Sequence, residues 1–240
     1  MPGVEVERVS DAVWRVGTPT VGLTSVLVRG EQRALVVDTG GGPRQGRQVQ
    51  RAVRELTALP LVVVNTHDHW DHWFANAVLL DEPGSAAEQR QAWGPPAVAW
   101  EARAREQWSE ALGHEPELRP DVLRPPTGTL EDGAVLDLGG LRVEVRVLGG
   151  HTAYDLALVA GEVALPGDLV EESGPPQLDR TSSLDRWVES LDVLLATGTR
   201  TFVSGHGRPV DRAFVVDQQR WLAAQRSGGG AGVGASAGPG

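Results

Sequence analysis

Two blocks of short β-type runs, each followed by helical segments, limit the folds open to this sequence. Each block contains four apolar or alternating runs. The runs cover residues 4–9, 13–16, 25–28 and 34–37, and then 134–138, 141–147, 156–160 and 163–165. Their length and alternation are typical of β-strands. Strands, helices, strands and helices again predict an α/β (α+β) chain, a four-layer αββα sandwich with two sheets between helical layers.

Helices and two further strands are predicted between and after these blocks. Pro43 begins a helix that runs to Leu56. Leu61 to Val64 form a continuous apolar run, which indicates a strand buried on both faces. Thr201 to Val203 form the last predicted strand. Other helices are expected at about 97–111, 183–196 and 211–225.

One domain is expected over residues 1–226, followed by a disordered tail rich in Gly, Ala and Ser at 227–240. Residues of about 80–130 differ in composition, and we interpret them as an insertion near the functional site. Trp100 and Trp108 in this stretch fit either an apolar pocket or one helix face packed on the core. The sequence leaves both alternatives open.

The composition excludes several kinds of site and partner. The chain has no cysteine, so a metal must bind to histidines and carboxylates. The net charge of −10 argues against nucleic acid as a partner, because phosphate contacts need a basic surface. Neither an apolar run of about 18 residues nor a basic and apolar leader is present. We therefore expect a cytoplasmic protein without a membrane partner, and the sequence does not give its oligomeric state.

Three of the six histidines lie within six residues, directly after the predicted buried strand. In an extended segment, side chains two residues apart point the same way, so His67 and His69 can bind one metal ion. Asp71 and His72 in the following turn can face a second ion. Imidazole and carboxylate are ligands that borderline metals such as zinc accept. The cluster therefore predicts a metal site.

The segment from His67 to His72, His-Asp-His-Trp-Asp-His, resembles the HxHxDH signature of the metallo-β-lactamase superfamily. Four shorter segments are similar to other motifs of that family and occur in the same order. They are Val36–Gly40, Gly149–Thr152, Pro166–Asp168 and Ser204–Gly207. The resemblance covers residues of about 4–226. It points to the glyoxalase II-like branch, since Asp168 stands where the antibiotic-hydrolysing branch uses a cysteine.

The resemblance implies a dinuclear metal centre with Asp71 and Asp168 as catalytic residues. The first ion would be bound by His67, His69 and His151, the second by Asp71, His72 and His206, and Asp168 would bridge them. Zinc is the expected metal, with manganese or iron as alternatives. Metal binding lowers the pKa of water to about 7. The resemblance thus implies that a bridging hydroxide cleaves an ester, thioester, lactone or related bond of a small molecule.

Four further residues have expected supporting roles. Asp38, Thr66 and Thr152 are expected to hydrogen-bond the outer ring nitrogens or carboxylates of the ligands, although ordinary turn chemistry also explains them. Tyr154, the only tyrosine, follows His151 by three residues and is a candidate for substrate contact.

Two other functions stay open. The mononuclear iron persulfide dioxygenases are similar to the same branch and keep the same motif residues. A non-catalytic member would use its metals for folding and serve as a binding module. A paired site with seven filled ligand positions favours the hydrolase, because structural zinc sites are closed and tetrahedral.

Overall fold

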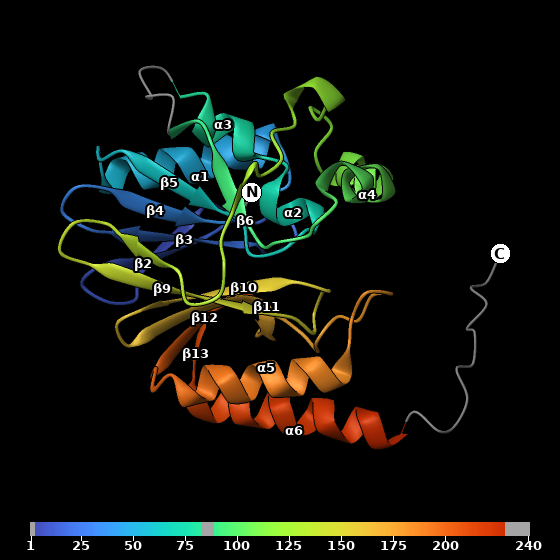
Figure 1. Cartoon of the computed structure of the whole chain (residues 1–240). Coiled ribbons are helices and arrows are strands. Elements are labelled where there is room, and N and C mark those ends of the chain that lie inside the picture. The colour runs from blue at the N-terminus through green and yellow to red at the C-terminus, as the bar shows by residue number, and fades with distance from the viewer. Residues whose placement is uncertain (1–2, 83–88, 229–240) are drawn as a thin grey trace.

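The structure is a computed structural model that describes residues 3–82 and 89–228. It consists of two β-sheets packed face to face between helices (Figure 1). The described helices are α1 (Pro43–Leu56), α2 (Trp70–Trp73), α3 (Asn76–Leu80), α4 (Trp100–His114), α5 (Leu184–Ala196) and α6 (Arg212–Gly228), with a 3-10 turn at Pro120–Val122. In Figure 1, α1 and α3 cover the first sheet, and α5 and α6 cover the second. The predicted four-layer αββα sandwich is confirmed.

Within the described residues, the first sheet has seven strands in sequence order. They are β1 (Glu5–Arg8), β2 (Val13–Gly17), β3 (Thr24–Arg29), β4 (Ala34–Val37), β5 (Leu61–Val64), β6 (Ala92–Gly94) and β7 (Gly128–Thr129). The first four strands pair antiparallel, and β4 to β7 pair parallel. Because parallel strands end at the same edge of a sheet, the segments after β4 and β5 lie side by side.

The second sheet has six described strands. Their order across the sheet is β13 (Pro209–Asp211), β12 (Thr201–His206), β11 (Val163–Glu171), β10 (Asp155–Ala160), β9 (Arg142–Leu148) and β8 (Val135–Asp137). Only the β11 and β12 pair is parallel among these strands. Both strands therefore carry their last residues, Glu171 and His206, to one end of the sandwich.

Alternating side chains divide the core into layers. In β3, Val26 and Val28 pack between the two sheets, whereas Leu27 packs towards α1. This is the period of two that a strand imposes on its side chains. A third apolar layer, which includes Leu191 and Leu222, joins the second sheet to α5 and α6. Burying each such side chain contributes roughly 1.5 to 3 kcal/mol.

The stretch of about 80–130 adds strands to the first sheet and places α4 beside α2. Trp100 packs edge-on against Trp73 with ring centroids 5.4 Å apart, and Trp108 lies 6.2 Å from Phe74. Both tryptophans thus belong to the apolar cluster between α2 and α4. Both tryptophans thus pack on the core, and Trp108 also lines a mainly apolar pocket with Trp73 and Leu123, so Trp108 fits both alternatives.

Several elements differ from the predictions. Strands β11 and β12 continue through Asp168 and His206, which the sequence placed in turns after the strands. Parallel pairing between these strands continues past the apolar residues, with a register shift at Gly167. Strands β6 and β7 were not predicted. Helix α6 reaches Gly228, so the expected tail at 227–240 starts inside the helix, and residues 229–240 lie outside the described part.

Within the described residues, none of the helices has both the length and the apolar character needed to cross a membrane.

Candidate metal centre

Seven side chains from both sheets meet at one end of the sandwich and form two groups of candidate metal ligands. Within each group, the ligand atoms all lie within 4.8 Å of one another. The first group is His67, His69, His151 and Asp168, and the second is Asp71, His72 and His206. These are the seven residues that the motifs predicted. Their roles as ligands remain a proposal, but the fold brings all of them together.

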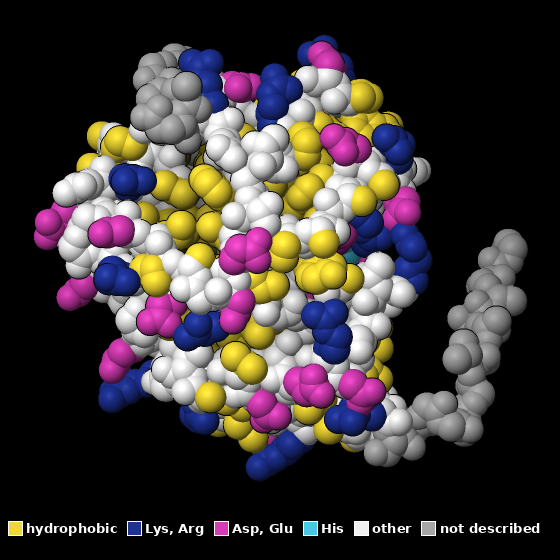
Figure 2. Space-filling model, viewed as in Figure 1, with side chains coloured by type: hydrophobic (Ala, Val, Ile, Leu, Met, Phe, Trp, Pro, Cys, Tyr) yellow, Lys and Arg dark blue, Asp and Glu magenta, His cyan; other side chains and the backbone are white. Residues whose placement is uncertain are grey.

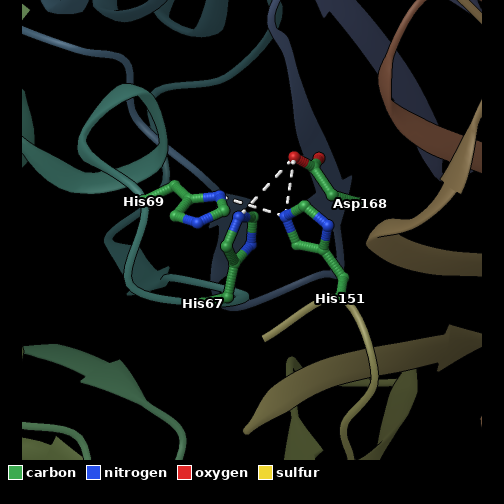
Figure 3. Close-up of side chains that lie close together, drawn as sticks. All are labelled: His67, His69, His151 and Asp168. Carbon is green, nitrogen blue, oxygen red and sulfur yellow. Dashed lines mark hydrogen bonds and ion pairs between the residues drawn. The ribbon is translucent and has the colours of Figure 1, made fainter. Parts of the chain in front are cut away.

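The first group joins the segment after β5 to the end of β9 and to β11 (Figure 3). The His69 Nδ1 and His151 Nε2 atoms are 3.0 Å apart. The Asp168 Oδ2 atom lies 3.6 Å from His67 Nε2 and 3.5 Å from His151 Nε2. The four side chains point towards one another, so a cation between them would be bound by three nitrogens and one oxygen.

The second group lies on α2 and at the end of β12. Helix α2 is only four residues long, and it carries both Asp71 and His72. The Asp71 Oδ2 atom lies 3.3 Å from His206 Nε2 and 3.8 Å from His72 Nε2. The predicted turn at Asp71 is thus one short helical turn, and it holds the two side chains towards His206.

Asp168 lies between the two groups. Its Oδ2 atom is 3.3 Å from His72 Nε2 and 3.4 Å from His206 Nε2, as close as it is to the first group. Gly205 on the neighbouring strand makes room for the carboxylate, because a Cβ atom there would lie 1.9 Å from Asp168 Oδ1. One carboxylate can therefore reach cations in both groups.

Several ligand atoms are buried and have no hydrogen-bond partner among the described residues. They are His67 Nε2, His72 Nε2 and Asp168 Oδ1. Buried polar atoms are normally paired, and unpaired ones are costly. A cation held by these nitrogens and oxygens would satisfy them, and imidazole with carboxylate is a ligand set of divalent zinc. The residues therefore fit two divalent metal ions.

Asp38 holds the ligand rings in place from behind. This residue has a left-handed backbone with φ of 58°. Its carboxylate accepts hydrogen bonds of 2.8 Å from the Thr66 backbone N–H, the Thr66 hydroxyl and His72 Nδ1. Because the Thr66 hydroxyl donates to Asp38, it must accept from His67 Nδ1 at 3.0 Å. Both rings thus carry their proton on Nδ1 and leave Nε2 for a metal.

Two other predicted residues lie elsewhere. The Thr152 hydroxyl donates to Asp155 Oδ1 at 2.7 Å and does not contact a ligand ring. His151 Nδ1 is buried and has no hydrogen-bond partner in the part of the chain that the structure describes. Thr152 therefore shapes the turn after His151. Tyr154 is exposed, lies beside Arg186, and does not line the cavity over the ligands. Substrate contact by Tyr154 stays a prediction, and this placement does not support it.

The structure adds contacts that the sequence did not predict. The His69 Nε2 atom lies 3.3 Å from Asp179 Oδ2, and Arg103 of α4 lies 3.1 Å from the same oxygen. His206 Nδ1 donates to the backbone carbonyl of Val21 at 3.0 Å. Asp179 and Val21 lie in loops, where neither motif nor periodicity marks them. The carbonyl contact cannot be seen in any side-chain pattern.

In the metal-free chain, the pKa values of His67 and His151 in the first group shift in the opposite direction to those of His72 and His206 in the second. Burial lowers the pKa of His151 to about 3 and that of His67 well below its usual value. Burial also acts against the charge on His72 and His206, but the facing carboxylate of Asp168 outweighs it and holds each pKa well above its usual value. Two rings of the first group are therefore neutral, the form that binds metal, whereas the second group holds protons that a metal must displace.

A cavity of about 660 Å³ lies over the ligands. Helix α4 contributes one wall, and the segment after β11 contributes the other. Its lining outside the ligands includes Arg103, Glu106, Gln107, Glu110, Glu171 and Arg180. In Figure 2, only a small spot of histidine surface is visible on the face shown, and acidic and basic side chains are interspersed over that face. The ligands thus lie at the base of a polar cavity.

Comparison with known sequences identifies the family. Residues 19–206 match the sequence family described as the Metallo-beta-lactamase superfamily. This span contains all seven candidate ligands and most of the chain. The chain therefore belongs to the metallo-beta-lactamase superfamily.

Two curated relatives share a quarter or less of the aligned residues with this chain. The chain is 23% identical over 202 residues to "Probable metallo-hydrolase YqgX" of Bacillus subtilis (strain 168). The matched region covers 80% of this chain and 88% of that protein. It is 25% identical over 201 residues to "Acyl-coenzyme A thioesterase MBLAC2" of Bos taurus, which covers 69% of this chain and 67% of that protein. With the family and the site, these relatives make the chain a metallo-hydrolase of the superfamily.

Solved structures show the same fold. A metallo-beta-lactamase from Pontibacter korlensis superposes with a TM-score of 0.72 at 19% identity, over 92% of this chain and 99% of that one. The DIM-1 metallo-beta-lactamase superposes with a TM-score of 0.68 at 18% identity, over 93% of this chain and 99% of that one. At this identity the likeness shows the fold alone.

Proposed function

We propose that this protein is a dinuclear metal-dependent hydrolase, with zinc as its metal, that cleaves an ester, thioester, lactone or related bond of a small molecule. The position of Asp168 carries the proposal. Its Oδ2 atom lies between 3.3 and 3.6 Å from four histidine nitrogens, two in each ligand group. A carboxylate so placed favours two ions that share one ligand over a single ion in a closed site.

Each group of candidate ligands would bind one of the two ions. His67, His69 and His151 would hold the first, Asp71, His72 and His206 the second, and Asp168 would bind both. Two divalent ions bound there supply Lewis acidity and a water molecule that ionises near neutral pH. Asp38 and Asp179 fix the orientation of the rings, and the cavity admits the substrate above them.

The relatives support a thioester among the candidate bonds. MBLAC2 of Bos taurus is named an acyl-coenzyme A thioesterase, and YqgX of Bacillus subtilis a metallo-hydrolase. The chain has no cysteine, and the one hydroxyl side chain in the described cavity lining, that of Ser173, makes no hydrogen bond to a histidine that could activate it. The described site therefore favours metal-assisted attack by water. A small-molecule partner fits a cavity of about 660 Å³.

The first experiment is metal analysis combined with a substrate screen. Protein purified without a metal-affinity tag should contain about two zinc ions per chain and hydrolyse at least one thioester, ester or lactone. Asp168→Ala should lose turnover and about one or both ions while it keeps its far-UV circular dichroism. Asp217→Ala, which removes an exposed carboxylate of α6, should do neither.

Other outcomes would contradict the proposal. About one iron per chain without hydrolysis would favour the dioxygenase. Asp168→Ala that fails to fold, together with a wild type that has no turnover, would favour a metal-stabilised binding module.

A further inference from the structure

Glu171 brings an additional carboxyl group to the cavity over the metal ligands. It is the last residue of β11 and follows Asp168 by three positions on the same strand. Glu171 pairs with His206 in the register of β11 and β12. Paired residues of neighbouring strands project from the same face of a sheet, so Glu171 points to the side of His206. Its side chain lines the cavity together with the ligands.

The side chain of Glu171 is largely buried, and its carboxyl group has no partner among the described residues. The residue is 5% exposed, and its side chain makes neither a hydrogen bond nor an ion pair with any described residue. Its backbone N–H donates to Gln218 at 2.9 Å, which fixes the end of the strand but leaves the carboxyl group free. Neither ligand group includes Glu171. A buried carboxyl group without a partner costs stability, which is typical of a group kept for binding.

The cations of the cavity are already paired with other acids. Arg103 contacts Asp68 and Asp179, and both Arg103 and Arg180 contact Glu106. Neither arginine contacts Glu171, so neither of them is a partner for its carboxyl group. Once Glu171 is ionised, a substrate carboxylate next to the scissile bond would meet a like charge in a site of low dielectric, where such charges repel strongly.

We propose that Glu171 determines specificity by binding a hydrogen-bond-donating group, foremost an ammonium, that lies close to the scissile bond of the substrate. The inference rests on the proposed hydrolase function and narrows its substrate class to esters or thioesters with an amino group in the acyl part. Acyl groups with a carboxylate at that position are disfavoured.

Binding of three matched hydroxamates tests the proposal without turnover. A hydroxamate binds to zinc, and the tails of 3-aminopropanohydroxamate, butanohydroxamate and succinic monohydroxamate differ only in ending in ammonium, methyl or carboxylate. Calorimetry on the zinc-loaded protein should show that the ammonium ligand binds about tenfold or more tightly than the carboxylate ligand. Glu171→Gln should reduce this ratio to within about threefold and leave the affinity for butanohydroxamate unchanged.

Glu162→Gln is the matched control, because Glu162 directly precedes β11 at the opposite end of the strand and is exposed. It removes the same charge and should leave the ratio as in the wild type. An equal shift in both variants, or an unchanged ratio in Glu171→Gln, would overturn the proposal. Loss of zinc from Glu171→Gln would also overturn it, because Glu171 would then support the metals and not the substrate.

Turnover separates this inference from the proposed function. If the hydroxamates show the expected preference but no ester or thioester is cleaved, the hydrolase proposal fails and the role of Glu171 in binding stands. If no hydroxamate binds to the zinc-loaded protein, both proposals fail.

Discussion

His69 faces Asp179 with one ring nitrogen and the candidate metal position with the other. Its Nε2 atom lies 3.3 Å from Asp179 Oδ2, while its Nδ1 atom lies 3.0 Å from His151 Nε2. Asp179 is itself fixed, because its Oδ1 atom accepts from the backbone N–H groups of Thr181 and Ser182. The loop between β11 and α5 thus sets the orientation of a ligand that belongs to the first sheet.

Replacing Asp179 should weaken metal binding without removing a ligand. Asp179→Asn keeps the size of the side chain but removes the charge that faces His69, so the ring loses its fixed orientation. Zinc affinity, measured by competition with a chelating dye, should fall by about 10- to 100-fold. Asp217→Asn, an exposed replacement on α6, serves as the control. Equal affinities in the two variants would show that Asp179 does not position the ring.

Replacing Asp38 should lower both stability and metal content. Asp38→Ala leaves the Thr66 N–H and His72 Nδ1 without their acceptor, and each buried unpaired group costs about 1 to 3 kcal/mol. The left-handed backbone at this position adds a further penalty for alanine, which asparagine tolerates better. Urea unfolding of the metal-free protein should rank wild type above Asp38→Asn and Asp38→Asn above Asp38→Ala. A reversed order would mean that these hydrogen bonds do not stabilise the fold.

A single methyl group at Gly205 should disrupt the metal centre. The added Cβ would lie 1.9 Å from Asp168 Oδ1, so the carboxylate must move away from the four histidines. We expect Gly205→Ala to lose at least one of the two zinc ions in metal analysis. Gly113→Ala in α4 is the matched control, since a Cβ there meets nothing within 4 Å, and it should stabilise the helix by about 0.5 to 1 kcal/mol. Full zinc content in Gly205→Ala would contradict the assigned position of Asp168.

Glu171 should have a measurable effect on how the stability of the metal-free protein depends on pH. Burial raises its pKa from the ordinary 4.5 to about 8, so the folded chain holds the proton more tightly than the unfolded chain. The contribution of Glu171 to the stability of the folded chain is therefore fully present below about pH 4.5 and is lost as the pH rises to about 8. Glu171→Gln has no such loss. The free energy of unfolding of the variant, relative to that of the wild type, should therefore increase by about 1 to 3 kcal/mol between pH 5 and pH 9. Urea titrations with a chelator present measure this difference, and parallel pH profiles would refute it.

The sequence by itself determined the candidate ligands and the layered fold. The HxHxDH segment is local, since four of the seven candidate ligands lie within six residues after β5. Their spacing in the sequence can therefore be recognised without knowledge of the conformation at the end of the strand. The long apolar runs had the same property, because a period of two identifies a strand without knowledge of its partner. For this reason the β1 to β5 and β8 to β11 runs could be placed from the sequence alone.

Only the tertiary structure decided which residues surround the ligands. Asp179 lies 110 positions from His69 in the sequence, and its bonds to Thr181 and Ser182 are those of any Asp in a turn. Strands β6 and β7, of three and two residues, are too short for a period to be seen. They exist because β6 pairs with β5 and β7 pairs with β6. Glu171 became distinct only when burial without a partner could be measured. Contacts of this kind depend on how separate segments pack, and a local pattern carries no information about the partner across the cavity.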